Sequence, residues 1–269
     1  MTDKNKQFRE ELFFNLPFVR LHLMKKTDFG FQDIFESDKP GLVRDLFGDV
    51  SSQYDLMNDV MSFGLHRLWK KHFVQKIPTR PAMKLLDVAG GTGDIAIRFL
   101  KENQALNPEV VVLDLTPEMI QKGKDKAYNS NITQGISWQC GMAEELPFED
   151  NTFDAYTISF GLRNVTDKEK ALAEAYRVLK PGCPFFCLEF SKIQGPLGFF
   201  YKAYAMKGIP LLGKLIAHNE GAYQYLSESI ERFWEPETLI QKMQEAGFVH
   251  TYFEALCKGL VAIHGGWKP

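Results

Sequence analysis

Cysteine is scarce in this chain of 269 residues, which contains four. No two of them form a C-x-x-C pair, and no histidine stands at zinc-binding spacing from them. The pattern gives no metal site and favours buried thiols in a reducing compartment over a disulfide framework. The four residues are Cys140, Cys183, Cys187 and Cys257.

Long hydrophobic runs and a strong net charge are also missing. Without a run of about 18 uncharged apolar residues, the sequence predicts no membrane-spanning helix. A formal net charge of -2 argues against nucleic acid as the main partner. With 45% hydrophobic and 25% charged residues, the composition is that of an ordinary globular protein.

The first 50 residues lack a sustained hydrophobic period. Residues 12–26 are apolar with only basic charges, and Pro17 interrupts any single helix there. This stretch is either a presequence remnant or an interfacial helix. Residues 27–50 are rich in turn formers, so we expect residues 1–50 to be a leader and N-terminal extension, and residues 51–269 a single domain.

Alternating strand and helix patterns dominate the rest of the chain. Residues 51–80 carry apolar positions at helical spacing and predict a helical cap. Short apolar runs then alternate with amphipathic helices, which is typical of an α/β protein with a mainly parallel sheet. Gly259 predicts a tight turn that makes the last two strands antiparallel. The expected strands are 84–89, 110–115, 136–140, 153–160, 184–190, 248–256 and 260–264, and the expected helices after the cap are 94–102, 117–129, 168–179 and 236–246.

One interval, residues 190–225, departs from this alternation. From Phe190 to Asn219 there is no Asp or Glu, while four lysines are interleaved with aromatic and aliphatic residues. We interpret the interval as an apolar, basic insertion. It is either a set of core-facing helices with solvated lysines, or the mouth for an apolar substrate at an anionic membrane surface.

A glycine loop follows the first of these strands and opens a helix. Gly91, Gly93 and Ala96 satisfy the G-x-G-x-x-G/A dinucleotide fingerprint. However, Asp87 and Asp94 flank the loop and would repel a pyrophosphate. S-adenosylmethionine (SAM) has an ammonium, a sulfonium and a ribose but no phosphate, so it suits this loop better.

Polar residues also follow the second and fourth strands. Asp114 lies 21 residues after Gly93, where an acid is placed to accept hydrogen bonds from a ribose. Arg163 and Asn164 follow the fourth strand and are expected to face the crevice at the carboxyl ends of the strands. The alternatives are an exposed strand-end acid and a surface loop that caps a helix.

Several segments together carry a resemblance to a known family. They are residues 53–70, 89–94, 148–163 with the run 158–167, 176–182 and 225–230. Over residues 28–268 the chain closely resembles the ubiquinone and menaquinone C-methyltransferase family.

This resemblance implies a Rossmann-like, class I SAM-dependent methyltransferase fold, with a mainly parallel seven-stranded sheet ending in an antiparallel hairpin. It implies methylation of the ring of a 2-methoxy-6-polyprenyl-1,4-benzoquinol in ubiquinone biosynthesis. Demethylmenaquinol is the alternative acceptor. A noncatalytic scaffold in a quinone-synthesis complex is the alternative role.

The resemblance also assigns residues. Tyr54, Arg163 and Asn164 would face the quinol. Met142 stands where the family usually has Asp or Asn, so recognition near the adenine would rest on backbone groups or on Glu144. The residues expected to bind the cofactor are Asp87, Gly91, Thr92, Gly93, Asp114, Met142, Ala143 and Ser159.

Methylating a ring carbon requires a reduced, deprotonated quinol. Arg163 is too basic to accept the proton, but it can stabilise the developing oxyanion or hold a water that takes the proton. His66 is the competing base, although a structural histidine is the better interpretation.

The resemblance bears on partners and location as well. It implies other quinone-biosynthesis proteins and a membrane surface as partners, and it leaves a homodimer open. The leader at residues 27–31 resembles mitochondrial and α-proteobacterial members. We therefore expect either the matrix side of the mitochondrial inner membrane or the bacterial cytoplasm at the inner membrane.

Overall fold

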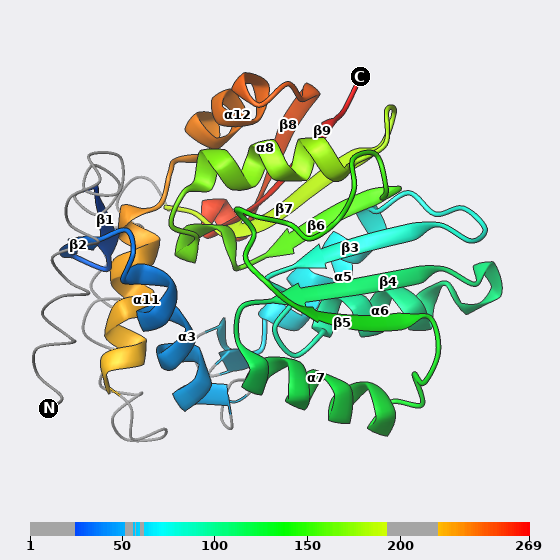
Figure 1. Ribbon diagram of the computed structural model, residues 1–269, viewed down its shortest axis with the longest axis horizontal. Coiled ribbons are helices and arrows are strands. Elements are labelled where there is room, and N and C mark those ends of the chain that lie inside the picture. The colour runs from blue at the N-terminus through cyan, green and yellow to red at the C-terminus, as the bar shows by residue number, and fades with distance from the viewer. Residues whose placement is uncertain (1–24, 52–55, 57, 60–61, 193–219) are drawn as a thin grey trace, which may run out of the picture.

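The computed structural model describes residues 25–51, 56, 58–59, 62–192 and 220–269. A seven-stranded sheet with the order β5-β4-β3-β6-β7-β9-β8 forms its centre (Figure 1). The first five strands in this order are parallel, whereas β9 runs antiparallel to both β7 and β8. The predicted sheet with its antiparallel C-terminal hairpin is thus confirmed. The strands are β3 (Lys84–Val88), β4 (Glu109–Asp114), β5 (Ile136–Cys140), β6 (Ala155–Ser159), β7 (Pro184–Phe190), β8 (Val249–Leu256) and β9 (Val261–Trp267).

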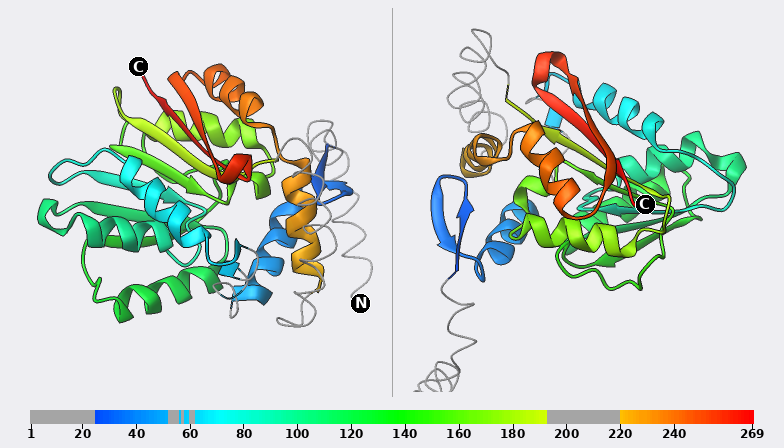
Figure 2. Two further views of the ribbon diagram at one scale, coloured as in Figure 1. Left: turned by 180° about the vertical axis from the view of Figure 1, so that it is seen from behind. Right: turned by 90° about the horizontal axis from the view of Figure 1, so that it is seen from above.

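Helices cover both faces of this sheet (Figures 1 and 2). On one face α8 (Lys168–Val178) and α12 (Pro236–Glu245) share a core cluster with β6 and β7. On the other face, α5 (His66–Lys76) and α6 (Asp94–Glu102) share a second core cluster. Helix α7 (Pro117–Asn129) contributes Ala127 to this cluster. The apolar runs are buried on both sides because helices lie above and below, as in other parallel sheets.

Helix boundaries follow local signals in the sequence. α7 begins with Pro117 at its first position, after Thr116. α8 is capped by Asp167, whose side chain accepts a hydrogen bond from the N–H of Lys170. The four helices predicted after the cap begin at the predicted residues and end within one residue of them.

Residues 26–50, expected to be part of a leader and N-terminal extension, are folded into regular elements. They form an antiparallel hairpin, β1 (Lys26–Phe29) and β2 (Gln32–Phe35), followed by α3 (Lys39–Val50). α3 packs against α11 (Glu220–Arg232) in a separate core cluster with Val50, Tyr223 and Leu226. Figures 1 and 2 show these elements gathered beyond the carboxyl ends of the parallel strands.

Other expectations fall partly outside the described residues. Most of the 190–225 insertion, part of the 51–80 cap and residues 1–24 lie outside them, and the division of the chain at residue 51 stays a prediction. Within the described part, no helix is both long and apolar enough to cross a membrane.

Candidate active site

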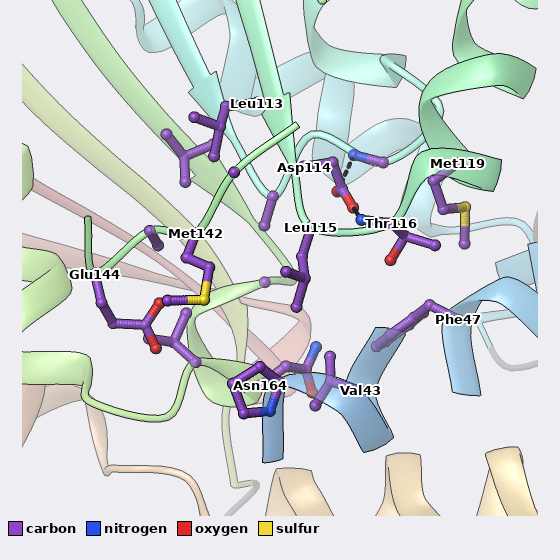
Figure 3. Close-up of a pocket in the computed structure, with 18 of the residues that line it drawn as sticks. Val43, Phe47, Leu113, Asp114, Leu115, Thr116, Met119, Met142, Glu144 and Asn164 are labelled. Carbon is purple, nitrogen blue, oxygen red and sulfur yellow. Dashed lines mark hydrogen bonds between the residues drawn. The ribbon is translucent and has the colours of Figure 1, made fainter. Parts of the chain in front are cut away.

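The main cavity of the candidate site lies at the carboxyl ends of β3, β4, β5 and β6 and comprises about 740 Å³, part of it open to solvent. It brings together five residues predicted from the sequence: Gly91, Asp114, Met142, Ala143 and Asn164. Asp114, Met142 and Asn164 are labelled in Figure 3. Helix α3 contributes another part of the cavity wall, through Pro40, Val43 and Phe47. The segment expected to be a leader therefore closes the site.

Asp114 is held in this cavity by the backbone. The N–H of Gly91 donates to its Oδ2 at 2.7 Å, and the N–H of Thr116 donates to its Oδ1 at 2.8 Å. Burial raises the pKa of Asp114, and these two hydrogen bonds act in the opposite direction. Each carboxylate oxygen keeps a further lone pair, so the side chain can still accept from a ribose hydroxyl.

The glycine loop has the backbone that such a close approach needs. Gly91 and Gly93 have φ of 55° and 75°, a region that side chains with a Cβ disfavour. A Cβ on Gly93 would lie 2.6 Å from the ring of Trp138, whereas one on Gly91 would meet nothing within 4 Å. The space beside Gly91 is thus open to a ligand.

A smaller cavity adjoins the first on the other side of this loop. Two predicted residues line it, Thr92 and Ser159, together with Lys70 and Asp94. The hydroxyl oxygens of Thr92 and Ser159 are buried and have no hydrogen-bond partner among the described residues. Buried hydroxyls normally have partners, so this pair fits a polar ligand such as the zwitterionic methionyl group of SAM.

The two acids that flank the loop do not act as the sequence suggested. Lys70 lies 2.5 Å from Asp94, and Lys126 pairs with the same carboxylate. Burial opposes ionisation of Asp94, but the two lysines hold its pKa well below the ordinary value. Because its charge is compensated, the argument that Asp94 repels a pyrophosphate was wrong.

Asp87 is completely buried under the loop and lines neither cavity. Its Oδ1 accepts a hydrogen bond of 2.8 Å from the hydroxyl of Thr157 on β6. Burial raises the pKa of Asp87 to about 7, so it is a weak source of repulsion. Its role in cofactor binding stays a prediction.

A third cavity of about 410 Å³ lies between α3, α11 and the end of β7. Its lining is mostly apolar, with Arg163, Tyr225 and Asn58 as the polar members. Phe160 lines all three cavities and has φ of 56°, a strained value for a residue with a side chain. Such strain is typical of functional sites. Because Phe160 lines all three cavities, it lies where they meet.

Arg163 is 5% exposed and makes a buried ion pair that the sequence did not reveal. Its Nη1 donates to Oε1 of Glu189 at 2.7 Å and to the carbonyl oxygen of Phe160 at 2.5 Å. Glu189, at the end of β7, is fully buried. Nε of Arg163 is buried without a partner among the described residues and is left as a donor.

Tyr225 on α11 also lines the site, and sequence reasoning did not single it out. Its hydroxyl donates to Oδ1 of Asn164 in η3 (Leu162–Asn164) at 3.2 Å, so it links Asn164 to the third cavity. The segment 225–230 contributed to the family resemblance, which was the available signal. The predicted Tyr54 lies outside the described residues.

His66 lies apart from these three cavities. Its Nε2 is 2.9 Å from Oδ1 of Asp59, and the residue is 7% exposed. Burial lowers the pKa of His66, while the hydrogen bond with Asp59 acts in the opposite direction. These contacts fit the structural interpretation better than a role as the base.

Comparison with known proteins gives consistent matches. A family model, the ubiE/COQ5 methyltransferase family, matches residues 34–268. The ubiquinone/menaquinone biosynthesis C-methyltransferase UbiE of Dinoroseobacter shibae is 49% identical over 245 residues, covering 91% of this chain and 97% of that protein. The mitochondrial 2-methoxy-6-polyprenyl-1,4-benzoquinol methylase of Dictyostelium discoideum is 42% identical over 272 residues, covering 91% and 87%. A solved methyltransferase bound to the Haloferax volcanii Trm112 activator has a TM-score of 0.62 at 19% identity, covering 84% and 97%, which shows a shared fold.

Proposed function

The chain belongs to the ubiE/COQ5 methyltransferase family and is a SAM-dependent C-methyltransferase, and from this premise we propose that it methylates the ring of a 2-methoxy-6-polyprenyl-1,4-benzoquinol in ubiquinone biosynthesis. The observation that carries the proposal is the apolar cavity containing Arg163, which meets the other two cavities at Phe160. A reduced quinone ring needs apolar walls and few polar groups near its oxygens, and this cavity supplies both.

The first two cavities bind different parts of SAM in this proposal. We assign the main cavity, with Asp114 at its end, to the adenosyl part of SAM, and the smaller cavity, with Thr92 and Ser159, to the methionyl part. The bound donor supplies an electrophilic methyl on a sulfonium. Glu144 contributes less to adenine recognition than the sequence suggested, because its Oε1 already accepts from the N–H groups of Thr166 and Asp167 at 2.8 and 3.3 Å.

Catalysis requires a quinol oxygen that gives up its proton and a ring carbon aligned with the methyl group. Arg163 acts as a fixed hydrogen-bond donor beside the developing oxyanion. Because Glu189 compensates its charge, Arg163 contributes directed N–H groups rather than a free positive charge. Asn164 orients the ring, and the apolar walls exclude water from the reacting atoms.

We also propose that the enzyme acts as a peripheral protein at the inner membrane, on the matrix side in mitochondria or the cytoplasmic side in bacteria. Phe63, just before α5, is 76% exposed, and Leu68, within α5, is 63% exposed. Exposed apolar side chains of this kind fit contact with a lipid surface. Binding to vesicles of anionic and of neutral lipids tests this, and Leu68→Ser should weaken it. Equal retention of wild type and L68S on both vesicles would contradict the proposal.

The deciding experiment supplies labelled SAM with chemically reduced acceptors and the full-length protein. We expect label in 2-methoxy-6-prenyl-1,4-benzoquinol. If label is transferred only to demethylmenaquinol, the proposed acceptor is wrong and demethylmenaquinol takes its place. SAM binding in a calorimeter separates an enzyme from a scaffold, since no binding at millimolar SAM would favour the scaffold.

A further inference from the structure

Tyr225 is the residue through which α11 touches the predicted catalytic segment. It is 5% exposed, lines the apolar cavity, and donates its hydroxyl to Oδ1 of Asn164 at 3.2 Å. Asn164 in turn lines the main cavity, so this hydrogen bond lies between the two binding regions.

The direction of that hydrogen bond fixes the chemistry of Asn164. With Oδ1 occupied by the tyrosine, the planar carboxamide presents its amino group, a donor, on its other side. Burial raises the pKa of Tyr225, so its hydroxyl keeps its proton and remains a donor to Asn164 at physiological pH. Asn164 is thereby set to donate to an electron-rich oxygen such as that of a quinol.

Tyr225 is itself held by the N-terminal hairpin. Its ring stacks on Phe29 of β1, with ring centroids 4.3 Å apart. One turn further along α11, Oε2 of Glu228 accepts from the N–H of Phe31 at 2.9 Å. One more turn along, Arg232 donates to the carbonyl of Phe31 at 3.3 Å. Spacings of three and four residues place these contacts on one face of α11.

Gly30, in the hairpin turn, makes this contact close. A Cβ at Gly30 would lie 2.2 Å from Oε2 of Glu228, and its φ of 60° disfavours any side chain. A side chain at position 30 would therefore strain the turn and displace the Glu228 carboxylate that accepts from Phe31.

We infer that Tyr225 is a positioning residue that acts through Asn164, and that the hairpin at residues 26–35 keeps it in place. The inference rests on the proposed function. It adds a residue to the part of the site that binds the quinol. It also means that the N-terminal hairpin affects turnover without contacting either substrate.

A double-mutant cycle tests the first part. Asn164→Ala should lower kcat by about tenfold and Tyr225→Phe by about fivefold, while the double variant should lose about tenfold rather than about fiftyfold, because the tyrosine acts through the asparagine. SAM affinity should stay within about twofold in each variant. The matched control is Tyr223→Phe on the same helix, whose buried hydroxyl has no partner among the described residues and whose loss should leave kcat unchanged. Independent, multiplying effects of Tyr225 and Asn164 would overturn the inference.

Two glycine variants test the hairpin. Gly30→Ala introduces the clash with Glu228, whereas Gly182→Ala has a similar φ of 75° and meets nothing within 4 Å. G30A should lower kcat by about fivefold and speed amide hydrogen exchange in α11 and η3, whereas G182A should do neither. Unchanged exchange in G30A would contradict the inference whatever the acceptor is.

The two proposals fail in different ways. If wild type does not methylate the benzoquinol, the proposed function is wrong, and the exchange experiment still decides the role of the hairpin. If wild type is active and Y225F matches it, the inference alone is wrong.

Discussion

We call the part of the site assigned to SAM, the methyl donor, the donor side, and the part assigned to the quinol the acceptor side. On the donor side, Asp114 is held by N–H groups of the loops that follow two adjacent parallel strands, β3 and β4. Asp114 needs no distant side chain for its orientation. On the acceptor side, Arg163 depends on Glu189, 26 residues away, and Asn164 depends on Tyr225, 61 residues away. Helix α3 and the hairpin add contacts from the N-terminal end of the chain.

The key acid of the donor side is thus oriented by backbone N–H groups at the strand ends, whereas the two polar residues of the acceptor side are oriented by other side chains. Variants of the acceptor side should therefore change turnover and leave SAM binding intact. Variants of the donor side should change SAM binding first.

The largest effect is expected for Arg163→Lys. A lysine keeps the charge but not the planar arrangement of donors, so kcat should fall by about 100-fold or more. SAM affinity should change little, and the control Arg44→Lys, on the exposed side of α3, should behave like wild type. Equal losses of SAM affinity and turnover would remove the separation between the two sides.

Glu189→Gln should destabilise the protein by about 3 kcal/mol, because it leaves the buried guanidinium without a counter-charge. Urea unfolding measures this, with the exposed Glu149→Gln as control. The double variant Arg163→Met with Glu189→Leu should regain stability but not turnover, since an apolar pair replaces the ions without their chemistry. A stable, fully active E189Q would mean that the acceptor side does not depend on the pair.

Asp87, buried under the glycine loop of the donor side, should make the free energy of unfolding depend on pH. Burial raises its folded pKa to about 7, above the value of about 3.9 for an unperturbed aspartate. As the pH rises, the unfolded chain releases this proton first, so the folded state loses stability between about pH 4 and pH 7. Above that range the loss levels off. The slope is at most about 1.4 kcal/mol per pH unit, and Asp87→Asn should abolish it.

The measurement is the free energy of unfolding from pH 4 to pH 8 for wild type and D87N. Asp125→Asn, an exposed substitution on α7, serves as the control. Parallel curves for wild type and D87N would show that Asp87 is not a buried, weakly ionised acid.

The sheet and its helices were predictable because their signals are local. Apolar runs marked the strands, and Thr116 with Pro117 marked the start of a helix. Asp114, Asn164 and the glycine loop came together as expected, since the carboxyl ends of parallel strands share one edge.

The acceptor side was harder because its determinants lie far apart in sequence. Glu189 sits in a fully apolar strand pattern and becomes meaningful only beside Arg163. α3 was missed because Gly41 and Gly48 weaken its helical pattern, and it is stabilised by packing against α11. Charge alone also misled, because the lysines that compensate Asp94 come from two other helices.

The smallest effect separates ligand binding from folding on the donor side. The hydroxyl of Ser159 is buried without a partner among the described residues, so Ser159→Ala should leave the free energy of unfolding unchanged. It should weaken SAM by about fivefold, or about 1 kcal/mol, through one lost hydrogen bond. Calorimetry and urea unfolding check the two values, with the exposed Ser137→Ala on β5 as control. A loss of stability equal to the loss of affinity would show that the hydroxyl is satisfied within the free protein, and the donor side would then need rearrangement before it binds.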